Sequence, residues 1–142
     1  MRLEGSIDIA RPMAEVFAFV ADPRNDPRWC ERVEWCIQLE GDGPARGAQY
    51  EALHRPSGYP WAHLRRIEVV ECDPPSRIRW RQADRIGVFD IEYVLEATDD
   101  GTRFTQRDAI AWRLPLSSLI GKRIVQRHIG EQQKALKEVL EE

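Results

Sequence analysis

The chain has 142 residues, of which 42% are hydrophobic and 32% are charged, and its formal net charge is −3. This length suits one domain with one hydrophobic core, and the composition excludes both a disordered chain and a membrane protein. No apolar run approaches the roughly 18 residues that a membrane-spanning helix needs, and the first ten residues hold no signal-peptide core. We therefore expect a single domain over residues 1–142 in the cytoplasm, without integral membrane association.

The cysteines, histidines and arginines argue against several classes of site. Cys30, Cys36 and Cys72 are odd in number and are not spaced like zinc ligands, so we expect reduced thiols. The histidines form no helical pair at metal-binding spacing, and no nucleotide-binding glycine loop opens a helix. Acidic residues are interleaved with the arginines, so no basic face is available to a phosphate backbone. We expect no metal, no cofactor and no nucleic acid.

The first part of the chain predicts a strand followed by two short helices. Residues 2–10 alternate between apolar and polar side chains, which is typical of a strand with one buried face. Residues 12–20 begin with Pro12 and space their apolar side chains three and four apart, as an amphipathic helix does. Pro23 and Pro27 then limit any further helix to about one turn.

The rest of the chain predicts six more strands and one long helix. Short turn sequences such as GDGPARG, DPPS and TDDG separate the strands, as in an antiparallel meander. After the last strand, from Leu116 to the end of the chain, apolar residues recur near every 3.6 positions. This spacing predicts a helix of roughly 25 residues. Gly121 and Gly130 within this helix indicate either a close approach to the sheet or a bend. The strands are expected at residues 31–40, 48–54, 64–72, 76–84, 88–97 and 102–112.

This order of elements predicts an α+β fold. A curved antiparallel sheet buries its concave apolar face only when another element covers it, and the long helix is the element large enough to do so. We therefore expect a helix-grip fold, in which a seven-stranded curved antiparallel sheet wraps around a long C-terminal helix. The two short helices lie between the first and second strands.

Several motifs accompany this order of elements. They include IDIARPMAEVFAFVADP at residues 7–23, EGDGPARGAQY at 40–50, VVECDPPSRIRW at 69–80 and DGTRFT at 100–105. Together they resemble the polyketide cyclase/dehydrase-like branch of the START-type helix-grip superfamily (SRPBCC) over nearly the whole chain. The resemblance implies a deep cavity between sheet and helix that takes an apolar small molecule, with the short helices at its mouth. It does not fix a reaction, because the superfamily includes carriers, receptors and enzymes.

Strand phase indicates which side chains face this cavity. In residues 102–112, Gln106 and Asp108 share a face with apolar neighbours, and in residues 76–84 the arginines occupy the face opposite Trp80. Apolar walls with a few converging polar groups are typical of a small-molecule site. The side chains expected to bind the ligand are Trp35, Tyr50, Trp80, Phe89, Tyr93, Gln106 and His128, with Trp29 and Trp61 near the mouth.

Two of the candidate residues have the chemistry of acid–base catalysts. Burial would raise the pKa of Asp108, and His54 close by would exchange protons near neutral pH. Tyr93 or Gln106 would hold a developing oxyanion. For each group a structural alternative stays open: a bulge would turn Asp108 to solvent, His54 lies next to a loop, and His128 suits a core position.

Three functions follow from these features. The first is binding of a hydrophobic small molecule, aromatic and polyketide-like or a lipid, between the sheet and the C-terminal helix. The second is a polyketide cyclase or dehydratase activity that uses Asp108 or His54 as the base. The third is a protein-interaction module, in which the apolar sequence GYPW at residues 58–61 and the helix ends dock on a partner or on a second copy of the chain.

Overall fold

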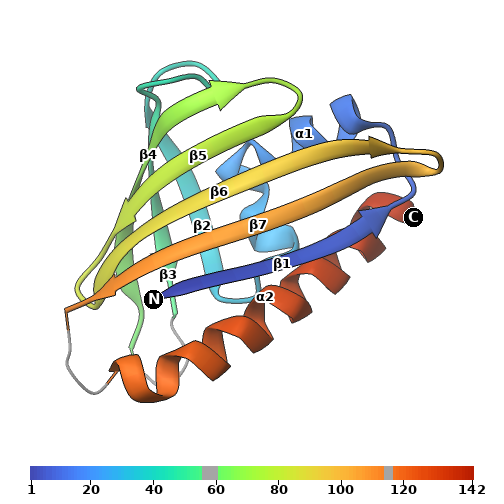
Figure 1. Cartoon of the computed structure of the whole chain (residues 1–142). Coiled ribbons are helices and arrows are strands. Elements are labelled where there is room, and N and C mark those ends of the chain that lie inside the picture. Colours follow the sequence, from blue (N-terminus) through green and yellow to red (C-terminus); the bar gives the residue numbers. More distant parts are fainter. Residues whose placement is uncertain (56–60, 114–116) are drawn as a thin grey trace.

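The computed structural model describes residues 1–55, 61–113 and 117–142, without the side chains of residues 117–120. Seven strands form one antiparallel sheet in the order β1-β7-β6-β5-β4-β3-β2, and the sheet curves around the C-terminal helix (Figure 1). The predicted helix-grip fold is confirmed. The strands are β1 (Arg2–Ile9), β2 (Val33–Glu40), β3 (Gln49–His54), β4 (His63–Asp73), β5 (Arg77–Ala83), β6 (Gly87–Thr98) and β7 (Gly101–Trp112).

Two short helices connect β1 to β2, as the sequence predicts. The α-helix α1 (Met13–Val20) buries Val16 and Val20, which lie one turn apart on the same face. The 3-10 helix η1 (Pro23–Arg28) follows at once, and the side chain of Asp22 caps it by accepting a hydrogen bond from the Arg24 backbone N–H at 3.0 Å. Pro27 lies inside this turn, so η1 stays short.

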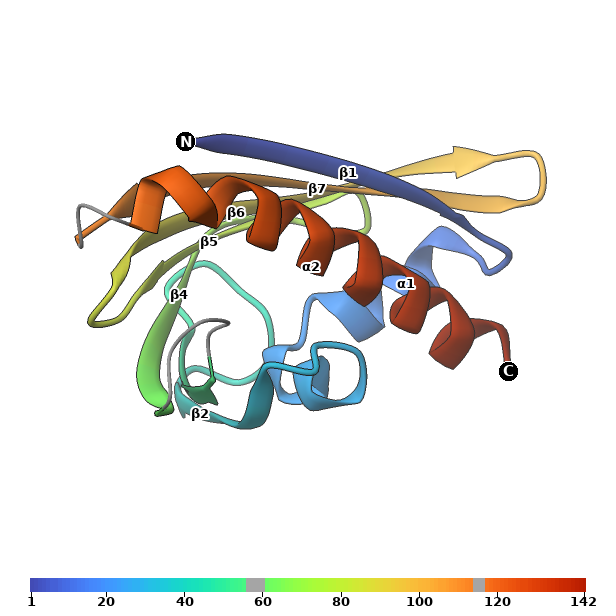
Figure 2. The same ribbon diagram turned by 90° about the horizontal axis from the view of Figure 1, so that it is seen from below.

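The long helix α2 (Ser117–Glu141) lies along one edge of the sheet (Figure 2). It packs tightly against β1 at Gly5, where a Cβ atom would lie 2.7 Å from Cγ2 of Ile129. At the far end, the Arg11 guanidinium donates to the Leu140 carbonyl at 2.6 Å, and the Lys137 ammonium donates to the Asp8 carbonyl at 2.8 Å. Because α2 is fixed to β1, the space between α2 and the β2–β3 side of the sheet is left for a cavity.

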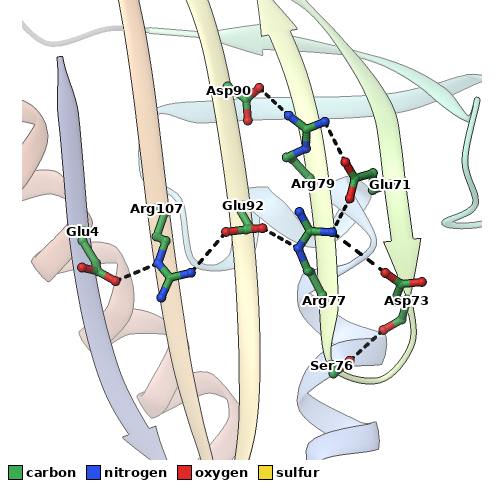
Figure 3. A network of polar contacts seen from close by, with 9 residues as sticks. All are labelled: Glu4, Glu71, Asp73, Ser76, Arg77, Arg79, Asp90, Glu92 and Arg107. Atoms are coloured by element: carbon green, nitrogen blue, oxygen red, sulfur yellow. Dashed lines mark hydrogen bonds and ion pairs between the residues drawn. The ribbon is translucent and has the colours of Figure 1, made fainter.

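Charged side chains cover the outer face of the sheet across the neighbouring strands β1, β7, β6, β5 and β4 (Figure 3). Arg107 pairs with Glu4 at 2.8 Å and with Glu92 at 3.4 Å, and Arg77 joins Glu92 to Glu71. Exposed pairs of this kind contribute less than about 1 kcal/mol each. Since acidic and basic side chains alternate across the strands, this face has no patch of one sign. The network is completed by Asp73, Ser76, Arg79 and Asp90.

Strand β2 departs from the predicted phase. The register shifts between Val33 and Trp35, so one extra residue is inserted on β2 opposite β3. A single inserted residue exchanges the inner and outer faces of a strand. Val33 lines the cavity, but Trp35 pairs with Leu53 on the outer face and is 38% exposed. Trp35, which was expected to face the cavity, therefore lies outside it.

Candidate functional site

A cavity of about 360 Å³ lies between the inner face of the sheet and α2. Aliphatic and aromatic side chains form most of its wall, and polar side chains enter it from β3, β4, β5 and β7. This composition is that of a small-molecule site. The apolar wall includes Ile67, Ile86, Phe89, Ile91, Ile110 and Trp112.

Arg65 places a buried guanidinium at the cavity wall. Its Nε and Nη2 donate to the same carboxylate oxygen of Asp84, at 3.0 and 2.9 Å, and both side chains are almost fully enclosed. The other oxygen of Asp84 accepts the backbone N–H groups of Ile86 and Gly87. Burial lowers the pKa of Arg65, and Asp84 opposes this effect. The carboxylate therefore fixes both the charge and the position of the guanidinium.

Part of the Arg65 guanidinium remains available to a ligand. Nη1 donates to Gln82 at 3.4 Å, and the guanidinium lies 4.1 Å above the centre of the Phe89 ring. Arginine has five N–H donors, and the contacts with Asp84 and Gln82 use three of them. Within the described part of the chain, two N–H groups have no acceptor.

Asp108 and Gln106 lie side by side on the inner face of β7. The register of β7 is continuous with both β1 and β6, so no bulge turns these side chains outward. Gln106 Nε2 donates to Asp108 Oδ1 at 3.0 Å. Burial raises the pKa of Asp108 to about 6, although the Gln106 hydrogen bond and the charge of Arg65 oppose this rise. Near neutral pH, Asp108 is thus able to accept or release a proton.

His54 lines the cavity but differs electrostatically from Asp108. Burial lowers its pKa to about 2, and the charges of Arg65 and Arg32 lower it further. The imidazole therefore stays neutral over the range in which most proteins are folded. A group with so low a pKa is a weak base, so the environment favours Asp108 over His54 in that role.

A second carboxyl group, Asp26 on η1, also lines the cavity. Burial raises its pKa well above the ordinary value, nearby Asp22 adds to the rise, and the Trp29 indole has a weaker opposing effect. Burial likewise raises the pKa of Tyr93 well above its ordinary value, with Asp26 as the next cause. Tyr93 is therefore a protonated hydrogen-bond donor at neutral pH, and the environment of Asp26 favours its protonated form.

Several aromatic side chains expected to bind the ligand pack in the core next to the cavity. Trp80 contacts Tyr93 edge to face at 4.4 Å between ring centres, and Tyr93 contacts Phe104 at 4.9 Å. Trp29 is buried against Tyr93 and Phe104, and Tyr50 is fully buried. Of these rings, Tyr93 lines the main cavity.

The remaining aromatic candidates lie in different places. Phe89 lines the cavity and is buried. Trp61, expected near the mouth, is 56% exposed and its ring centre lies 6.5 Å from that of His63. The rest of the GYPW sequence, residues 58–60, lies outside the described residues.

Sequence reasoning missed Arg65, Asp26 and Arg32, all of which line the cavity. For Arg65 a signal was present in the strand phase, because Arg65 lies on the same face of β4 as Ile67 and Val69. In the structure these side chains and that of His63 are all buried. Asp26 and Arg32 lie in η1 and in the connection that follows it. Neither segment has a period from which the direction of a side chain could be inferred.

Trp112 lines the cavity close to Gly121, near the start of α2. Its ring lies edge to face against Phe89 at 5.9 Å. Gly121 on α2 allows this position, because a Cβ atom there would lie 2.8 Å from Cζ2 of Trp112. The position of the Trp112 ring therefore depends on the absence of a side chain at residue 121.

We expect Gly121→Ala to lower the free energy of unfolding by about 1–2 kcal/mol, since the added methyl group forces Trp112 to move. Gly130→Ala in the same helix is the matched control, because nothing lies within 4 Å of its Cβ position. Alanine there should raise stability by up to about 1 kcal/mol. Urea unfolding of both variants gives the comparison. Equal stabilisation by the two substitutions would show that the position of the Trp112 ring does not require a glycine at residue 121.

The described residues provide no evident metal site. They contain no group of three or more His, Cys, Asp or Glu side chains placed to hold an ion. Cys30, Cys36 and Cys72 are free thiols, and burial raises the pKa of Cys30 well above its ordinary value. Within the described ranges, no helix is both long and apolar enough to cross a bilayer.

The fold is the helix-grip fold, with a cavity between the sheet and α2. Residues 1–141 match the family described as polyketide cyclase/dehydrase and lipid transport, and the chain belongs to this family. A curated relative, an uncharacterized protein of Mycobacterium tuberculosis, is 30% identical over 97 residues. That alignment covers 56% of this chain and 39% of the relative, so the chain spans well under half the length of that protein.

Solved structures show the same fold at low sequence identity. The Zhui aromatase/cyclase from Streptomyces sp. R1128 is 15% identical with a TM-score of 0.85, over 99% of this chain and 93% of that one. A START superfamily protein from Mycobacterium smegmatis is also 15% identical, with a TM-score of 0.84 over 99% and 97% of the two chains. Protein TTHA0849 from Thermus thermophilus is 16% identical, with a TM-score of 0.78 over 97% and 95%.

Proposed function

We propose that this protein binds one hydrophobic small molecule that carries oxygen substituents, in the cavity between the sheet and α2. The observation that carries this proposal is the buried Arg65 guanidinium, which is held by Asp84 and has two N–H groups without acceptors among the described residues. A carbonyl, phenolate or carboxylate oxygen of the ligand would accept these hydrogen bonds. The rest of the molecule would pack against the apolar wall.

The size and polarity of the cavity narrow the class of ligand. A volume of about 360 Å³ is near the lower end of the range for small-molecule pockets, about 300–1,000 Å³. It suits one compact molecule and is too small for a lipid with two long chains. Because Arg65, Gln106 and Asp108 all reach the cavity, an aromatic or polyketide-like molecule with several oxygens fits better than a simple hydrocarbon chain.

The binding test is a fluorescence titration with anthraquinone-2-carboxylic acid, with palmitic acid as the single-chain lipid for comparison. We expect quenching by the anthraquinone at micromolar concentration. Val125→Trp places a large ring in the cavity from α2 and should weaken binding at least ten-fold. Val139→Trp is the matched control, since it makes the same substitution in α2 at a residue outside the cavity wall. Equal affinity in the two variants would show that the probe binds elsewhere, and a failure of wild type to bind either probe would favour a docking role.

A second candidate function is cyclase or dehydratase chemistry, favoured by the pKa of about 6 for Asp108 and by the fold shared with an aromatase/cyclase. In this reaction the Asp108 carboxylate would remove a proton from a carbon next to a carbonyl group, and Arg65 would stabilise the enolate oxygen. Asp26, whose pKa burial raises, would then donate its carboxyl proton to the departing hydroxyl, which leaves as water. Asp108→Asn should abolish turnover and retain ligand affinity. Full turnover in that variant would eliminate this candidate.

A further inference from the structure

One hydrogen bond joins two residues of the cavity wall that lie on different elements. Arg32, in the connection between η1 and β2, places Nη2 3.2 Å from Nε2 of His128, near the middle of α2. Elsewhere, the described residues of α2 bond to the opposite side, as in the contact of Gln126 with the Glu4 carbonyl at 3.1 Å. The Arg32–His128 contact thus joins α2 to the connection between η1 and β2.

This contact lies between two hollows. A second hollow of about 80 Å³ is lined by Trp29, Glu31 and Glu131, together with Ala135. Arg32 and His128 line both this hollow and the main cavity, as does Gln132. Separating Arg32 from His128 would connect the two spaces and widen the mouth along α2.

We propose that the Arg32–His128 hydrogen bond is a latch across the cavity mouth, and that a ligand enters between residues 29–32 and α2 when this bond opens. The inference rests on the proposed function, since it assigns the route by which the bound molecule reaches the cavity.

The charges around the latch are consistent with a contact that is closed at neutral pH. Arg32 donates, so His128 must be neutral at Nε2 to accept. Burial lowers the pKa of His128, and the charge of Arg32 lowers it further. Arg127 on α2 acts in the same direction, whereas Glu131 on α2 and Glu31 in the connection act against it; His54 on β3 also faces His128. The neutral form that the latch needs is therefore the form present at neutral pH.

Cys30 is a reporter for opening of the latch. It lines the main cavity, and it is 6% exposed. In a Cys36→Ser/Cys72→Ser background, the rate at which iodoacetamide modifies Cys30 measures access to the cavity. His128→Phe keeps a ring of similar size and removes the acceptor, so we expect the rate to rise about ten-fold, the effect of losing a hydrogen bond to a charged group.

Gln126→Ala is the control, because it removes a hydrogen bond between α2 and β1 on the other side of the helix. Its modification rate should equal that of the parent. An unchanged rate in His128→Phe, or an equal rise in Gln126→Ala, would overturn the latch.

The labelling result is independent of any ligand, so it separates the two proposals. Binding is measured in the same proteins with 1-anilinonaphthalene-8-sulfonate. Faster labelling in His128→Phe without binding of this probe to any variant would support the latch and count against the proposed ligand site. Binding of the probe with unchanged labelling would support the site and overturn the latch.

Discussion

Replacing Asp84 with asparagine should lower the free energy of unfolding by about 3–5 kcal/mol. The side chain keeps its size and one oxygen, but it loses the charge that compensates Arg65. Both partners of this pair are buried, with side-chain exposures of 9% for Arg65 and 0% for Asp84. Removing one member of a buried pair leaves the other charge without compensation, and costs of this size are typical. Urea unfolding at neutral pH measures the change.

Two further variants show whether the uncompensated charge is the cause. Glu34→Gln removes the partner of Arg55 from a pair that is largely exposed, and it should cost less than about 1 kcal/mol. Adding Arg65→Met to Asp84→Asn removes the isolated charge and should recover most of the lost stability, because no uncompensated charge then remains buried. A loss in the double variant as large as in Asp84→Asn alone would point to the turn at Ile86 and Gly87 as the cause.

The fold was predictable because its signals are repeated along the chain. Alternation with a period of two identifies each strand, and the change to a period of 3.6 identifies α2. Each signal extends over many residues, so one irregular position does not erase it. The observed bounds of α2, Ser117–Glu141, agree with the helix of roughly 25 residues expected from the sequence.

The site was less predictable because it depends on single positions. One inserted residue in β2 moved Trp35 to the outer face, and nothing in the local sequence marks that bulge. Arg65 was overlooked because charged side chains seldom lie in a core unless they are paired, and its partner Asp84 lies 19 positions further along the chain. Strand phase also predicts the face of the sheet on which a side chain lies, but not whether that side chain reaches the cavity. Trp80 points inward, as expected, but packs in the core beneath the cavity.

Asp108→Asn should have the opposite effect on stability from Asp84→Asn. Burial raises the pKa of Asp108 from 3.8 to about 6, so the folded protein binds this proton more tightly than the unfolded chain does. At 1.36 kcal/mol for each pKa unit, ionised Asp108 costs about 3 kcal/mol of stability. The cost is absent below about pH 4, grows as the pH rises, and is complete above about pH 6. Asparagine carries no such cost, so the variant should be more stable by up to about 3 kcal/mol at pH 7.

The check is urea unfolding of wild type and Asp108→Asn at pH values from 4 to 7.5. The two proteins should be close in stability at pH 4 and diverge with rising pH, since only wild type has to ionise a buried carboxyl group. Parallel pH profiles would mean that Asp108 titrates at its ordinary pKa. A residue that lowers stability at neutral pH in this way is typical of a functional site, where a strained or poorly solvated group is kept for its chemistry. A stabilised Asp108→Asn variant that loses the turnover of wild type would therefore support the cyclase or dehydratase candidate. If wild type shows no turnover and the stabilised variant binds the ligand as wild type does, the result would support a carrier.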